Sequence, residues 1–142
     1  MLKGLVLDYG GVLTDYGEDG DTEPPLLAVL RLVREHGVRT ALLSNADGLW
    51  SPPEDWDDLF DAVVVSGEIG FGKPDERVYL LTADRLGLPP EQCVFVDDLA
   101  INVRGAAVAG MVGVHHTSVR TTVEELETLL ALPLRVGPHR DG

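Results

Sequence analysis

The sequence has 142 residues, enough for one domain with a buried core, and its hydrophobic content of 44% is typical of a globular protein. Asp and Glu number 24 against 11 Lys and Arg, and the formal net charge of −13 repels nucleic-acid phosphates and anionic membrane surfaces. We therefore expect neither nucleic acid nor membrane as a partner. The single cysteine, Cys93, excludes an internal disulfide, and no apolar run approaches the ~18 residues of a membrane span, so we expect a cytoplasmic protein.

Short apolar segments alternate with longer helical segments along the chain. The apolar segments lack a polar/apolar alternation, which is typical of strands buried on both faces of a parallel sheet. We expect strands at 4–7, 40–43, 62–65, 93–96 and 112–115. Proline near the start and glycine after the end mark most of the helices, which we expect at 25–36, 54–60, 74–86, 101–109 and 121–130. Thr121 and Glu124 have the spacing of a capping box for the last one.

This alternation predicts an α/β fold: a doubly wound, Rossmann-like parallel sheet of five strands with helices on both faces. We expect residues 1–132 to form a single domain and residues 133–142 to form a polar C-terminal tail. In such folds ligands bind beyond the carboxyl ends of the strands. The residues that follow each strand are therefore the first candidates for a functional site.

Polar side chains stand at four of these strand ends: Asp8, Ser44 with Asn45, Lys73 after a short loop, and Asp97 with Asp98. A carboxylate at a strand tip can attack phosphorus and form an aspartyl phosphate. A hydroxyl and an ammonium group can hold phosphoryl oxygens, and further carboxylates can hold a hard cation such as Mg²⁺. The net charge of −13 would oppose a phosphate-bearing substrate, which also indicates a local cation.

Four segments in this order resemble the motifs of the haloacid dehalogenase superfamily. They are DYGGVL at 8–13, LSN at 43–45, GKPD at 72–75, and VDD at 96–98 followed by Asn102. The resemblance implies that Asp8 is the catalytic nucleophile and that Lys73 offsets its charge. It also implies that Ser44, Asn45 and Lys73 bind the phosphate.

The same resemblance implies a Mg²⁺ site. Asp8, the backbone carbonyl of Gly10, Asp97 and Asp98 would be its ligands, with Asp98 as the direct ligand and Asp97 as a ligand or an orienting group. Asn102 would orient these groups. His115 and His116 have no third ligand at metal spacing, so we expect neither to bind a metal.

One position departs from the phosphatases of this family, which usually carry a second aspartate, acting as general acid, two residues after the nucleophile. Gly10 stands there, so we expect weak turnover or a substitute acid from Asp15 or Asp19. If Gly10 had a positive φ, an aspartate in its place would be strained by about 1 kcal/mol or more.

This departure leaves three functions open. The first is a Mg²⁺-dependent phosphatase, and the second is a non-catalytic binding or scaffold protein with a vestigial site. The third is a metal-independent 2-haloacid dehalogenase, since those relatives also lack the second aspartate. Asp97 and Asp98 weigh against it, because without a cation they would repel a carboxylate substrate.

The segments between the motifs, residues 9–43 and 45–72, are too short to contain the cap domain that many family members insert there. We therefore expect a capless site that is open to water and acts on a small phosphorylated molecule or a phosphoprotein. Self-association that covers part of the site, giving a homo-oligomer, is a further expectation. Trp50 and Trp56 are expected to pack a loop or short helix, or to line the mouth of the site.

Overall fold

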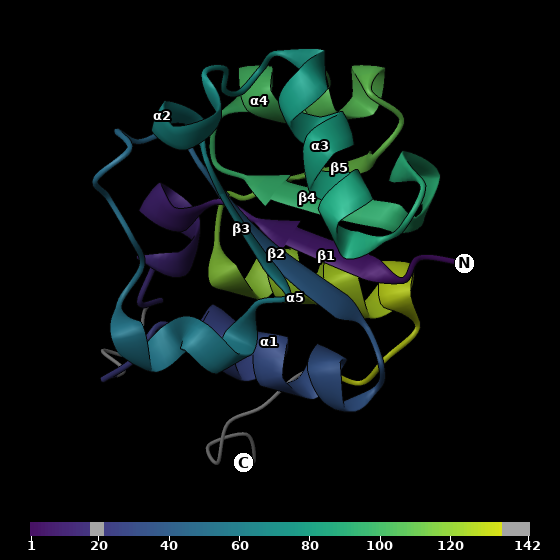
Figure 1. Cartoon of the computed structure of the whole chain (residues 1–142). Coiled ribbons are helices and arrows are strands. Elements are labelled where there is room, and N and C mark those ends of the chain that lie inside the picture. Colours follow the sequence, from purple (N-terminus) through teal and green to yellow (C-terminus); the bar gives the residue numbers. More distant parts are fainter. Residues whose placement is uncertain (18–21, 135–142) are drawn as a thin grey trace.

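The computed structural model describes residues 1–17 and 22–134 (Figure 1). A five-stranded sheet, in which every pair of neighbouring strands is parallel, lies at its centre in the order β3-β2-β1-β4-β5. The strands are β1 (Gly4–Leu7), β2 (Arg39–Ser44), β3 (Ala62–Val65), β4 (Cys93–Asp97) and β5 (Val112–His115). This sheet confirms the predicted fold class and, within one or two residues, the predicted strands.

Helices cover both faces of the sheet, because the strands are apolar on both sides (Figure 1). The helix α1 (Pro25–Glu35) packs with α5 (Val119–Leu130) on one face, whereas α3 (Glu76–Leu86) packs with α4 (Ala100–Val108) on the other. Leu5 and Leu7 of β1 join the first core and Val6 joins the second, as expected where successive side chains point to opposite faces. Shorter helices are η1 (Tyr9–Leu13), η2 (Glu54–Leu59), α2 (Ser66–Ile69) and η3 (Pro90–Gln92).

Two predicted helix starts were wrong by two residues. The helix predicted from residue 121 begins at Val119, because the hydroxyl of Ser118 accepts a hydrogen bond from the Thr121 amide at 3.1 Å. Thr121 therefore donates to the cap instead of forming it. The helix predicted from residue 74 begins at Glu76, with Asp75 as its N-cap.

The folded chain extends beyond the predicted boundary at residue 132. Leu134 is fully buried in the core beneath α1 and α5, and its amide donates a hydrogen bond to a Glu127 carboxylate oxygen at 2.9 Å. The remainder of the predicted tail, residues 135–142, lies outside the described residues. Apolar burial thus places Leu134 with the core and not with a polar tail.

The strand order creates the crevice in which the site lies. The central strand is β1, with β2 beside it on one side and β4, which comes later in the chain, on the other side. Helices that leave β1 and β4 toward opposite faces open a space at the carboxyl ends of these two strands. Asp8 and Asp97 stand at those ends, so the topology brings the first and last of the four motifs together.

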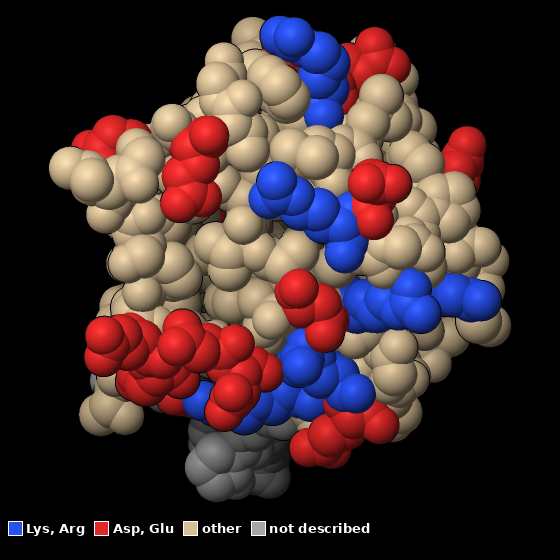
Figure 2. Space-filling model, in the orientation of Figure 1, with Lys and Arg blue, Asp and Glu red and all other residues tan. Residues whose placement is uncertain are grey.

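The charged side chains are mixed on the face shown in Figure 2, in which Lys and Arg alternate with Asp and Glu. A cluster of acids covers η2, whose first turn contains Glu54, Asp55 and Asp57. In residues 1–17 and 22–134, no helix combines the length and the hydropathy that a membrane span requires.

Candidate active site

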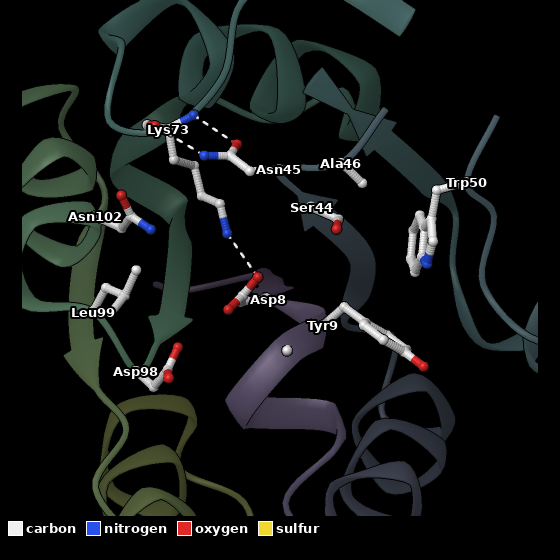
Figure 3. A pocket seen from close by; sticks show the side chains of 11 residues that line it. Asp8, Tyr9, Ser44, Asn45, Ala46, Trp50, Lys73, Asp98, Leu99 and Asn102 are labelled. Carbon is white, nitrogen blue, oxygen red and sulfur yellow. Dashed lines mark hydrogen bonds and ion pairs between the residues drawn. The ribbon is translucent and has the colours of Figure 1, made fainter. Parts of the chain in front are cut away.

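The side chain of Lys73 joins the ends of two neighbouring strands at the base of the crevice (Figure 3). Its Nζ donates hydrogen bonds to Asp8 Oδ1 at 2.7 Å and to Asp97 Oδ2 at 2.9 Å. The lysine side chain is only 2% exposed, so water scarcely screens either ion pair. Leaving either carboxylate without a partner here would cost several kcal/mol. Lys73 therefore fixes the position of the Asp8 carboxylate.

Asp97 and Asp98 are adjacent in sequence but lie in different surroundings. Asp97 is fully buried, and its Oδ2 also accepts a hydrogen bond from Asn102 Nδ2 at 3.1 Å, while Oδ1 accepts one from the Leu99 amide at 2.9 Å. The Asp98 carboxylate makes no hydrogen bond or ion pair with any described residue. Asp97 thus orients Lys73 and Asn102, whereas Asp98 keeps both oxygens available.

The acidic groups in the crevice fit a divalent cation. Asp8, Asp97 and Asp98 each offer one carboxylate oxygen, and these atoms all lie within 4.8 Å of one another. Lys73 is the one ammonium beside them among residues 1–17 and 22–134, so the cluster is negative when all three acids are ionised. A set of oxygen donors with excess negative charge suits a hard cation such as Mg²⁺. Gly10 also lines this cleft, where its carbonyl was expected to contribute.

Burial changes the acidity of the expected nucleophile. Removal from water raises the pKa of Asp8 to about 6, the ion pair with Lys73 opposes this rise, and the neighbouring Asp97 adds to it. The carboxylate is the form that can attack a substrate. Additional positive charge in the cleft would favour that form at neutral pH.

Ser44 and Asn45 follow β2 but have different environments. The Ser44 residue is 5% exposed and lines the cleft, and its hydroxyl has no hydrogen-bond partner among the described residues. A nearly buried hydroxyl without a partner is unfavourable, so a ligand or water is expected there. Asn45 lines the cleft too, but its Oδ1 accepts from the Lys73 amide at 2.9 Å and its Nδ2 donates to the Lys73 carbonyl at 3.0 Å. Both polar atoms of Asn45 therefore position Lys73.

The two glycines after Tyr9 have different backbone conformations. Gly10 has a φ of −71° and a ψ of 126°, which every residue type can adopt, and a Cβ there would meet no atom within 4 Å. The positive φ considered for Gly10 was wrong, because it belongs to Gly11, with a φ of 83°. A Cβ on Gly11 would also overlap the carboxylate of Asp98. Gly11 is therefore a site residue that the sequence reasoning missed, although the pair of glycines was its signal.

The first expected substitute acid lies outside the cleft lining. Asp15 Oδ2 is 2.8 Å from His116 Nε2, and its Oδ1 accepts a hydrogen bond from the Gly17 amide. Although burial opposes the shift, these bonds hold the pKa of Asp15 below its usual value, which makes it a poor proton donor. His116 Nδ1 contacts the Thr122 hydroxyl at 2.7 Å, so this histidine links the loop after η1 to α5. The other expected acid, Asp19, lies outside the described residues.

The sequence places this architecture in a known family. A family model described as haloacid dehalogenase-like hydrolase matches residues 17–110, which is more than half of the chain. The chain belongs to the haloacid dehalogenase-like hydrolases. It is 37% identical over 118 residues to the mouse protein named acyl-CoA dehydrogenase family member 10, and 35% identical over 105 residues to phosphatase MT3486 of Mycobacterium tuberculosis. These alignments cover 80% and 70% of this chain, but only 11% and 48% of the two relatives.

Solved structures of related proteins support the same fold. A Corynebacterium glutamicum protein is 37% identical to this chain, with a TM-score of 0.86 and coverage of 96% of this chain and 100% of that one. A haloacid dehalogenase family enzyme from Bacteroides thetaiotaomicron has a TM-score of 0.61 and 15% identity, over 84% of this chain and 96% of the other. That structure contains magnesium and inorganic phosphate.

Proposed function

We propose that this protein is a Mg²⁺-dependent phosphomonoester hydrolase that acts through an aspartyl phosphate on Asp8. The observation that carries the proposal is the buried Lys73, paired with Asp8 and Asp97, beside the unpaired carboxylate of Asp98. This cluster positions a nucleophile and retains negative charge that a cation would neutralise. The name of the M. tuberculosis relative and the magnesium and phosphate in the B. thetaiotaomicron enzyme support the same chemistry.

Each residue has a defined part in the reaction. Ser44 and Lys73 bind the phosphoryl oxygens, and an Asp8 carboxylate oxygen attacks phosphorus as the bond to the leaving oxygen breaks. Mg²⁺ held by Asp8, Asp98 and the Gly10 carbonyl would neutralise charge on the phosphoryl group. Asn45 and Asn102 position Lys73 and Asp97, respectively.

The absence of an acid at Gly10 limits this chemistry. A positioned general acid is worth about 10² to 10⁴ in rate, so esters whose leaving group must be protonated should react slowly. We propose further that the site works without a cap domain. The segments that could contain one hold η1, α1, η2 and α2 as their described helices. Water can then reach the aspartyl phosphate and complete the hydrolysis, and the open cleft can accept a small phosphorylated molecule or a phosphoprotein.

A non-catalytic binding protein is the second candidate, and Gly10 is the observation that favours it. Metal-independent dehalogenation is disfavoured, because Asp97 and Asp98 would repel the carboxylate of a 2-haloacid. Self-association over the cleft remains a proposal that sedimentation at high protein concentration would test.

An activated aryl phosphate separates the three functions. We expect release of p-nitrophenol with Mg²⁺, loss of the reaction with a chelator, and loss in the Asp8→Asn variant. No release at high protein concentration, with Mg²⁺ binding retained, would support the binding protein instead. Halide release from a 2-haloacid in the presence of chelator would support the dehalogenase.

A further inference from the structure

The walls of the cleft differ in character from its charged base. The cleft has a volume of about 360 Å³, within the range of small-molecule sites, so it has room for a leaving group as well as a phosphoryl group. Trp50 and Tyr9 lie on one side of Asp8, and Leu99 lies on the other (Figure 3). None of these three side chains is needed to hold the phosphoryl group or the metal. They are placed where the remainder of a substrate would lie.

The aromatic wall is a packed unit and not a single loose ring. The rings of Tyr9 and Trp50 meet edge to face with centroids 4.9 Å apart, and Tyr9 also packs against Trp56 at 5.7 Å. Trp56 is buried in the core, so Tyr9 connects Trp50 to the body of the protein. Opposite, Leu99 is 54% exposed and presents an apolar side chain to the cleft. An indole and a leucine on opposite sides of a cleft favour an apolar group between them.

The charges in the cleft exclude an anionic leaving group. Lys73 is the one basic residue among the described residues that line it, and Asp8 and Asp97 already occupy its Nζ. Phosphate esters that carry a carboxylate or a second phosphate would need another cation, because Mg²⁺ and Lys73 together only balance the three carboxylates of the cluster. An uncharged leaving group needs no such cation.

The same lining contains no free proton donor for the leaving oxygen. Its titratable residues are Asp8, Tyr9, Lys73 and Asp98, of which the proposed reaction uses all but Tyr9. Tyr9 directs its ring toward Trp50 and away from Asp8 (Figure 3). The leaving oxygen therefore has to depart as an anion, which an alcohol does poorly and a phenol does well.

We propose that the substrates are phosphate monoesters of uncharged phenols, with the aromatic ring held between Trp50 and Leu99. This inference rests on the proposed phosphatase function. Asp8 attacks phosphorus, the bond between phosphorus and the phenolic oxygen breaks, and its electron pair leaves on the phenolate, which takes a proton from water. Water then attacks the phosphorus of the aspartyl phosphate and loses its proton to solvent, which releases inorganic phosphate and regenerates Asp8.

The test compares esters whose phenols have similar acidity, so that binding and not leaving-group chemistry separates them. With Mg²⁺, 2-naphthyl phosphate should half-saturate the enzyme at a concentration about 3- to 10-fold lower than phenyl phosphate does, because one aromatic contact contributes about 0.5–1.5 kcal/mol. The phosphate ester of 4-hydroxyphenylacetate should have a kcat/KM about fivefold or more below that of phenyl phosphate, because its carboxylate is repelled. Glycerol phosphate should be slower by about 10² or more.

Three variants assign the effect to the aromatic wall. Trp50→Ala should remove the naphthyl preference, so that the two esters half-saturate the enzyme at similar concentrations, and Trp50→Phe should keep most of the preference. Leu49→Ala is the matched control, because Leu49 is the neighbouring residue, is 96% exposed and does not line the cleft. Equal half-saturating concentrations of the two aryl esters in the wild type, or an unchanged preference in Trp50→Ala, would overturn the inference.

Binding to the Asp8→Asn variant distinguishes failure of this inference from failure of the proposed function. Calorimetry with Mg²⁺ should show tighter binding of 2-naphthyl phosphate than of phenyl phosphate, whether or not the wild type turns over. A binding preference without hydrolysis would refute the phosphatase but retain the aryl site. Hydrolysis without any binding preference would refute the aryl site alone.

Discussion

Replacing Gly10 with aspartate should restore a general acid, and the structure allows the cost to be worked out. The φ of −71° and ψ of 126° at Gly10 suit an aspartate, and no atom lies within 4 Å of the new Cβ. The backbone cost is therefore close to zero, and loss of glycine freedom in the unfolded chain should stabilise the variant by about 0.4–1 kcal/mol. The nearby Asp8 and Asp98 should raise the pKa of the new carboxyl, which keeps it protonated for donation.

The expected gain depends on the leaving group. An alkyl phosphate, whose oxygen must be protonated, should gain on the order of 10² or more in kcat, equivalent to about 3 kcal/mol of barrier. An aryl phosphate with an acidic phenol should gain much less. The assay is phosphate release from glycerol phosphate and p-nitrophenyl phosphate by wild type and Gly10→Asp, with Mg²⁺ and at matched protein concentration.

The neighbouring glycine provides the control. Gly11→Ala should lower stability and Mg²⁺ affinity, because it combines a φ of 83° with a Cβ that overlaps the Asp98 carboxylate. A folded Gly10→Asp variant that binds Mg²⁺ but gains nothing on either ester would refute the reasoning. In that case Gly10 would not limit turnover, and the binding-protein function would gain support.

Three further outcomes follow from the ion pairs at the base of the cleft. Burial raises the pKa of Asp8 from 3.8 to about 6, so between these pH values the metal-free folded protein holds a proton that the unfolded chain has lost. The free energy of unfolding of the wild type, relative to that of Asp8→Asn, should therefore fall by about 2–3 kcal/mol from pH 4 to pH 7. Urea unfolding across this range measures the difference, and a constant offset between the two proteins would contradict it. Lys73→Met should lower the free energy of unfolding by about 3–5 kcal/mol, because two buried carboxylates lose their partner. Arg77→Met, which breaks the exposed pair with Asp75, is the control and should be nearly neutral. Mg²⁺ should raise the thermal midpoint of the wild type and not that of Asp98→Asn; equal shifts would exclude Asp98 as a ligand.

The sequence by itself determined the strands and the residues at their ends. The apolar segments without alternation could only be buried on both faces, and parallel strands bring their carboxyl ends to one edge. Asp8, Ser44, Lys73 and Asp98 therefore had to meet once the segments were recognised, and the structure places all four in one cleft. Gly10 was singled out differently, from the resemblance to the family's first motif, in which phosphatases usually carry a second aspartate.

Only the tertiary structure decided which atom of each residue faces which partner. The resemblance already favoured Asp98 over Asp97 as the direct ligand. The structure adds that Asp97 is enclosed with Lys73, whereas the Asp98 carboxylate is left open. Asn45 has its polar atoms occupied by a backbone 28 positions away, a contact that no local pattern encodes. The cleft-facing position of Trp50 depends on its packing with Tyr9. Such contacts depend on side-chain rotamers and on segments distant in sequence, whereas strands and their ends follow from local hydrophobicity.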